Sequence, residues 1–257
     1  MSTMKTIVTL VTGLAFMLLT SCQFSEKIYI NEDGSGQVIF SMDASEMMGF
    51  MGQMGDDASE GMDKAVDSTI IFKEFLVAYK DSIASLSPVE QEKIKAMEDY
   101  KLHMVMDPDK DKMLFDIEAD FKNANELRDM FKAMNSFNDF KGAENASENA
   151  AFSPFSNLGN DGATAVSYAY DGRLFERKAE ILDAEKHQQA LDSLGKSEMI
   201  FASSKYKIEY HFPKAIKSFS KEGAMYSLDK KTVSFEVGFL EMLKNPELQD
   251  IEVVLED

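Results

Sequence analysis

Residues 26–42 read EKIYINEDGSGQVIFSM, and this stretch decides the expected fold. Val38, Phe40 and Met42 occupy every second position after the turn residues at 32–34. Alternation with a period of two places such side chains on one face of a β-strand. A short turn containing Asp and Gly between two strand patterns predicts a β-hairpin.

The same pattern recurs along the chain. Two more hairpins are expected over about 100–121 and 165–181, the second around the Asp171-Gly172 turn. Further strand patterns cover 204–212, 232–237 and 250–256. Strands that alternate with helical segments predict the α+β fold class, with mainly antiparallel β-hairpins interrupted by amphipathic helices.

Helical periodicity is clearest after residue 71. One apolar stripe predicts an amphipathic helix there, formed by Phe72, Phe75, Leu76, Tyr79, Ile83 and Leu86. Ser87, Pro88 and Glu90 have the spacing of an N-cap, a first helical position and a capping box, so a helix should restart at Pro88. Other helices are expected after Asn123, over 184–194 with Gly195 as its C-cap, and near 239–243.

The expected organisation follows from these elements. It comprises a signal peptide at 1–21, an N-terminal α+β region at 22–140 with a Met-rich segment at 43–66, a polar linker at 141–163 and a C-terminal α+β region at 164–257. The alternative is one interleaved domain over 22–257.

The first residues resemble an export signal. Lys5 precedes the apolar run IVTLVTGLAFMLL at 7–19. This run suits a signal peptide and is shorter than the roughly 20 residues of a membrane-spanning helix. It ends in Leu19, Thr20, Ser21 and Cys22, which resembles the lipobox of bacterial lipoproteins. Small residues before the cysteine admit the signal peptidase, and the cysteine sulfur would carry the lipid.

Cysteine usage and charge agree with that interpretation. Cys22 is the only cysteine of 257 residues, so the mature chain can form no internal disulfide, and lipidation would consume the thiol. The formal charge is −18 and becomes −19 without the signal peptide and its single Lys. So acidic a chain is repelled by phosphate backbones, which excludes a nucleic-acid partner. Gln23, at the second mature position, favours the outer membrane over the inner one.

Two stretches resemble LppM-type bacterial lipoproteins. The first is Asp33-Gly34-Ser35-Gly36 in the hairpin after the cysteine. The second comprises Phe212-Pro213, Lys221-Glu222-Gly223 and Lys231-Thr232-Val233-Ser234-Phe235. Together they cover about a quarter of the chain, and the C-terminal membrane helix common in that family has no counterpart here. The resemblance implies placement in the cell envelope and contact with lipid or glycolipid.

Methionine forms the most unusual cluster, at Met47, Met48, Met51 and Met54. The last three are spaced as i, i+3 and i+6 on a helix. Thioethers are soft ligands that suit Cu(I), which makes a copper buffer one alternative. A flexible apolar surface that contacts lipid or a partner is the other, favoured by the interleaved glycines and the lack of nearby His or Cys.

Other candidate motifs fail on spacing. The acidic stretch from Asp107 to Glu118 imitates a calcium loop, but Lys112 stands where an EF-hand requires Gly. The Gly195-Lys196-Ser197 triplet lacks the upstream Gly of a phosphate-binding loop. The histidines, His103, His187 and His211, are expected on polar, solvated faces, and no pair has metal-ligand spacing.

The leading expectation is therefore a non-catalytic, lipid-anchored envelope protein that contacts a lipid, glycan or protein partner. It would have no catalytic residues, metal or cofactor, because no nucleophile or metal constellation is present. The alternatives are an envelope hydrolase that uses paired carboxylates and the Met-rich Cu(I) buffer.

Overall fold

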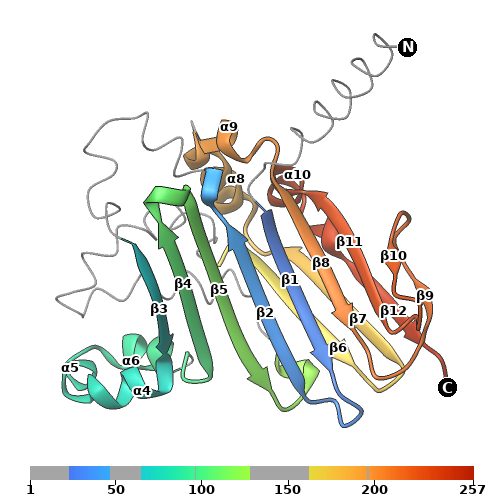
Figure 1. Ribbon diagram of the computed structural model, residues 1–257, viewed down its shortest axis with the longest axis horizontal. Coiled ribbons are helices and arrows are strands. Elements are labelled where there is room, and N and C mark those ends of the chain that lie inside the picture. The colour runs from blue at the N-terminus through green and yellow to red at the C-terminus, as the bar shows by residue number, and fades with distance from the viewer. Residues whose placement is uncertain (1–22, 47–64, 96, 128–161, 196) are drawn as a thin grey trace, which may run out of the picture.

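The computed structural model describes residues 23–46, 65–95, 97–127, 162–195 and 197–257. Within them the chain forms two β-sheets and several short helices, which confirms the predicted α+β class (Figure 1). The strands are β1 (Gln23–Ile30), β2 (Gly36–Asp43), β3 (Val66–Ile71), β4 (Tyr100–Asp107), β5 (Lys112–Phe121), β6 (Thr164–Tyr170), β7 (Leu174–Ile181), β8 (Lys205–His211), β9 (Ile216–Phe219), β10 (Met225–Tyr226), β11 (Thr232–Gly238) and β12 (Ile251–Leu255).

The larger sheet has eight strands in the order β10-β11-β8-β1-β2-β5-β4-β3. The smaller sheet has four, in the order β6-β7-β12-β9, and Figure 1 shows it behind β1, β8 and β11. Neighbouring strands pair antiparallel with one exception, because β1 and β8 run parallel. The strands from before and after the expected linker therefore share the larger sheet.

The three predicted hairpins are confirmed. β1 pairs with β2 from Gln23↔Asp43 to Ile30↔Gly36, β4 pairs with β5, and β6 pairs with β7. The stretch after Asp107 is the tip of the β4–β5 hairpin, a 3-10 turn η1 (Pro108–Lys110) in which the Lys110 ammonium lies 2.5 Å from the Asp107 carboxylate. The interpretation of this stretch as a hairpin tip is confirmed.

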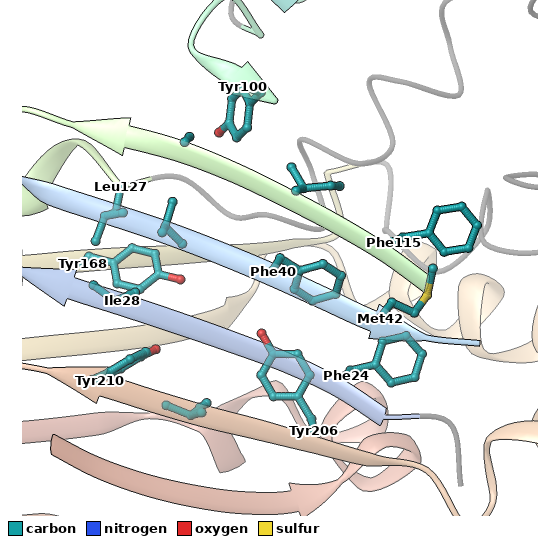
Figure 2. Packing of buried hydrophobic residues seen from close by; sticks show 14 of the residues in the cluster. Phe24, Ile28, Phe40, Met42, Tyr100, Phe115, Leu127, Tyr168, Tyr206 and Tyr210 are labelled. Atoms are coloured by element: carbon teal, nitrogen blue, oxygen red, sulfur yellow. The ribbon is translucent and has the colours of Figure 1, made fainter. Parts of the chain in front are cut away.

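The core lies between the sheets. Period-two alternation turns Phe24, Ile28, Phe40 and Tyr206 of the larger sheet inward, and Figure 2 shows their side chains together. Aromatic contacts continue this core to the end of the sheet where β1 begins. There the Phe24 ring stacks on Phe239 with 3.9 Å between centroids. Such burial of large apolar surface is the main stabilising term of the fold.

The helices are α4 (Phe72–Ala78), α5 (Lys80–Ala84), α6 (Pro88–Lys95), α8 (Ala184–Leu194), α9 (Ser197–Phe201) and α10 (Phe239–Lys244), with 3-10 turns η2 (Ala124–Glu126) and η5 (Pro246–Gln249). The expected bounds of α8 and the restart at Pro88 are confirmed, and Gly195 follows α8 with a φ of 48°. Asn123 caps η2 by accepting a hydrogen bond from the Asn125 N–H (2.9 Å).

One predicted helix is wrong in its extent. The stripe from Phe72 to Leu86 was expected on a single amphipathic helix, but the chain breaks at Tyr79, whose φ and ψ of −107° and 20° are not helical. Of this stripe only Phe72 is buried, against the larger sheet. The other residues of the stripe are only partly buried, and Tyr79 is 39% exposed, so packing does not hold one straight helix.

Candidate functional site

A buried carboxylate lies between the two sheets. Glu26 is the fourth residue of β1, and the alternation that turns Phe24 and Ile28 inward turns its side chain inward too. Its side chain is 2% exposed. A charge removed from water at this depth requires hydrogen bonds and an opposite charge nearby.

Three tyrosine hydroxyls supply the hydrogen bonds. Tyr206 donates to Oε2 of Glu26 at 2.8 Å, and Tyr168 donates to Oε1 at 3.2 Å. Tyr210 also donates to Oε1. Tyr206 and Tyr210 come from β8, beside β1 in the larger sheet, whereas Tyr168 reaches across from β6 in the smaller sheet. Figure 2 shows the three rings near Ile28 and Phe40 in the core.

The opposite charge is Arg177 of β7, also 2% exposed, whose Nε lies 3.5 Å from Oε1 of Glu26. Its Nε–H does not meet hydrogen-bond geometry with any described group, so charge attraction is what links it to the carboxylate. The rest of the guanidinium is held by Gln249 of η5, whose main-chain carbonyl accepts from Nη1 at 3.2 Å and whose side-chain oxygen accepts from Nη2. The Tyr168 ring lies 5.8 Å from the guanidinium carbon, which adds a cation–π contact.

The surroundings change the pKa of these groups. Burial raises the pKa of Tyr206 and of Tyr210 well above the ordinary value, and the negative charge of Glu26 raises it further. Burial by itself would lower the pKa of Arg177, but Glu26 and the three tyrosines together outweigh burial, and the pKa lies well above the ordinary value. The hydroxyls therefore keep their protons, and the guanidinium keeps its charge.

We call Glu26, Arg177, Tyr168, Tyr206, Tyr210 and Gln249 the inter-sheet cluster. Its members are enclosed by the core, and Glu26 contacts an arginine and three hydroxyls rather than a second carboxylate. A hydrolase with paired acids needs two carboxylates on either side of an accessible bond. The geometry of the inter-sheet cluster is that of a clamp that holds the two sheets in register.

The site residues predicted from the sequence fall outside the residues that the structure describes. Cys22 and the flanking Leu19, Thr20 and Ser21 fall outside the described residues, as do Met47, Met48, Met51 and Met54. The sequence-based interpretation of these residues therefore stays a prediction. The expected linker at 141–163 lies outside the described residues except for its last two positions.

The histidines differ in their surroundings. His103 and His211 lie on the outer face of the larger sheet as predicted, and the Nε2 of His103 is 2.9 Å from the Asp67 carboxylate. His187 was expected on a solvated face, and that prediction is wrong. It is buried, and its Nε2 lies 2.8 Å from the Leu243 carbonyl oxygen, which ties α8 to α10.

The described ranges contain neither a metal-ligand cluster nor a membrane-spanning helix. In these, no group of three or more His, Cys, Asp or Glu side chains is placed to hold a metal ion. Nor does any helix of this part of the chain have the length and apolar character to cross a bilayer.

The inter-sheet cluster was not predicted from the sequence, although the sequence contains a signal for it. Glu26 stands between Phe24 and Ile28, and Arg177 between Phe175 and Ala179, at positions whose neighbours two residues away are apolar. A charged residue in the inward phase of an alternating strand must find a partner in the core. The inward orientation of both side chains could have been predicted in this way, but their pairing could not.

Comparisons with known proteins add a distant likeness. No family model matches the chain, and no curated protein matches it. A solved structure that is similar is the NMR structure of the folded domain of LppM from Mycobacterium tuberculosis, with 10% sequence identity over 93% of this chain and 94% of that chain, and a TM-score of 0.35. Similarity at this level assigns neither activity nor ligand.

Proposed function

We propose that the protein is a bacterial lipoprotein, held to an envelope membrane by lipid on Cys22, whose folded body binds a lipid, glycan or protein partner without catalysis. One observation carries the proposal. The apolar run at 7–19 ends in Leu19, Thr20, Ser21 and Cys22, the pattern of a lipobox, and Cys22 is the only cysteine of the 257 residues.

The inter-sheet cluster supports a non-catalytic body. Glu26 is the buried carboxylate of the described core, and its oxygens already accept from three tyrosines. A general acid or base must reach the proton it transfers, and an enclosed carboxylate cannot do so without opening the core. The cluster therefore fits a structural role.

The Met-rich segment is proposed to contact lipid or a partner. The chain leaves the described fold after β2, whose last residue Asp43 pairs with Gln23, and returns before β3, where Val66 pairs with Met106. Because β4 and β5 join at this same end through the turn after Asp107, both flanks of the segment lie at the sheet end that carries Gln23. A soft apolar side chain suits a lipid or an adaptable partner at that end.

The location is proposed to be the outer membrane, since Gln23 is not the aspartate that retains some lipoproteins at the inner membrane. Two or more acyl chains on the cysteine would give a stable anchor, whereas one chain binds only marginally.

The test is metabolic labelling with an alkyne fatty acid, followed by membrane fractionation. The wild type should carry label and sediment with membranes, and Cys22→Ala should carry none. A matched control is Ser25→Ala, three residues later, which should label like the wild type. An unlabelled wild type would overturn the proposal. Mass spectrometry of the wild-type N-terminal peptide should show an acylated Cys22 as its first residue.

A further inference from the structure

We propose that the protein stands on its membrane with α9 against the lipid headgroups and Met199 inserted among them. This inference rests on the proposed lipid at Cys22 and adds an orientation and a contact surface. The occupant of the surface is the bilayer that holds the lipid.

Met199 lies beside the point where the tether would leave the fold. It is two residues before Phe201, whose ring centroid lies 6.0 Å from the ring centroid of Phe24. Phe24 is the second residue after Cys22. The strand that follows α9 begins at Lys205, which pairs with Gln23. Figure 1 shows α8, α9 and α10 gathered at this end of the larger sheet, where β1 begins.

The fold leaves no spacer between this end and the lipid. Gln23 already pairs with Asp43 on one side and Lys205 on the other. Cys22 is bonded directly to Gln23, and consecutive Cα atoms are about 3.8 Å apart. A lipid on its sulfur therefore brings the headgroup layer to the level of α9.

The chemistry of this end suits a lipid surface. The Met199 side chain is 82% exposed, and an unbranched thioether adapts to disordered surroundings. Leu182, which precedes the N-cap of α8, is 60% exposed in the same group of helices. The nearest charge on α9, Glu198, is paired with Lys244 at 2.6 Å, so the helix does not present an isolated negative charge to the headgroups.

A second exposed apolar group lies at the opposite end and makes the orientation testable. Leu228 is fully exposed in the turn before Thr232, and Thr232 pairs with His211, the last residue of β8. β8 runs from Lys205, beside Gln23, to His211. Its length of about 20 Å, at roughly 3.3 Å per residue, separates Leu228 from the tether end.

The experiment labels an introduced cysteine, which is possible because Cys22 is the single cysteine of the chain. Lipidated mature protein is purified from membranes as the Met199→Cys or the Leu228→Cys variant, each labelled with an environment-sensitive fluorophore. The proteins are reconstituted into vesicles of phosphatidylethanolamine and phosphatidylglycerol that contain a lipid with a nitroxide near its headgroup. Because lipidation consumes the Cys22 thiol, each variant should take up one label per chain.

The label at position 199 should lose most of its fluorescence to the nitroxide, and the label at position 228 should lose almost none. Equal quenching at both positions, quenching at neither, or stronger quenching at 228 overturns the proposed orientation. Two labels per chain would show a free Cys22 thiol, and would overturn the proposed tether rather than the orientation alone.

Discussion

Glu26 and Arg177 form an ion pair across the two sheets, with 3.5 Å between Oε1 and Nε and both side chains 2% exposed. Neither residue is near its partner in the sequence, and each belongs to a different sheet. The desolvation of two charges costs free energy, and the three tyrosines and Gln249 offset part of it. Such a pair contributes mainly to the choice of one arrangement of the sheets, and it makes the loss of either charge costly.

Removing the Glu26 charge should destabilise the fold strongly. Glu26→Gln leaves Arg177 buried without an opposite charge, which we expect to lower the free energy of unfolding by about 3–5 kcal/mol. Urea denaturation of the mature protein measures this change. The control is Asp257→Asn, which removes the exposed Arg173–Asp257 pair at 2.9 Å and should cost less than about 1 kcal/mol. Similar losses for the two variants would contradict a buried ion pair.

Removing both charges should be less harmful than the single losses suggest. Arg177→Met replaces the arginine by an apolar side chain of comparable length. In the double variant with Glu26→Gln, therefore, neither buried charge remains without its partner. We expect the double variant to unfold at a higher urea concentration than Glu26→Gln alone. Additive losses in this double-mutant cycle would show that the two residues do not interact.

Tyrosine ionisation should reveal the cluster at alkaline pH. The pKa of Tyr206 and of Tyr210 is raised above its unfolded value of about 10, so both stay protonated in the native state while the unfolded chain loses these protons. Their stabilisation is complete below pH about 10 and is lost as the pH rises through the raised values. Absorbance titration should show these two tyrosines ionising only together with unfolding. Tyr206→Phe should remove one group from that late step, whereas full ionisation of all eight tyrosines before unfolding would contradict it.

Gly36 should tolerate no side chain. A Cβ at this position would lie 1.9 Å from the Tyr29 carbonyl oxygen and 2.5 Å from Cζ of Phe121. Gly36→Ala should therefore lower the free energy of unfolding by about 3 kcal/mol. Gly34 has a φ of 82° and no atom within 4 Å of a built Cβ, so Gly34→Ala should cost only the backbone strain of about 1 kcal/mol. A larger loss for Gly34→Ala in thermal denaturation would refute the close contact at Gly36.

The Met-rich segment should bind copper no better than an aliphatic one. Leucine keeps the apolar character of methionine but lacks the sulfur ligand. We expect the mature Met47→Leu/Met48→Leu/Met51→Leu/Met54→Leu variant to bind Cu(I) with the same affinity as the wild type in competition with a chelator. The control replaces the exposed Met199 and Met225 by leucine. A loss of affinity only in the first variant would favour the copper buffer over the lipid contact.

The hairpins could be predicted because their evidence is local. Val38, Phe40 and Met42 alternate, a turn precedes them, and the structure pairs them with the preceding strand. The pairing of β1 with β8 has no such local signal in the sequence. Nothing near Gln23 or Lys205 in the sequence indicates that the two meet, since any exposed strand edge could accept a parallel partner.

The inter-sheet cluster could be predicted from the sequence only in part. The inward phase of Glu26 and of Arg177 could be inferred from their apolar neighbours, but the sheet packing that makes them partners could not. For His187 the local sequence led to a wrong prediction, because its polar neighbours Glu185, Lys186 and Gln188 indicated exposure to solvent. Its burial comes from α10, which docks on that side of α8 through the carbonyl of Leu243.

The parallel pairing of β1 with β8 has a consequence for the order of events in the cell. A chain delivered N-terminus first exposes residues 23–30 long before residues 205–211 arrive to complete their pairing. Closure of the larger sheet must wait for that late strand, and contacts so distant in sequence make folding slow. Until then the larger sheet stays incomplete. A truncation before residue 205 would leave β1 as an uncovered edge, prone to pair with other chains.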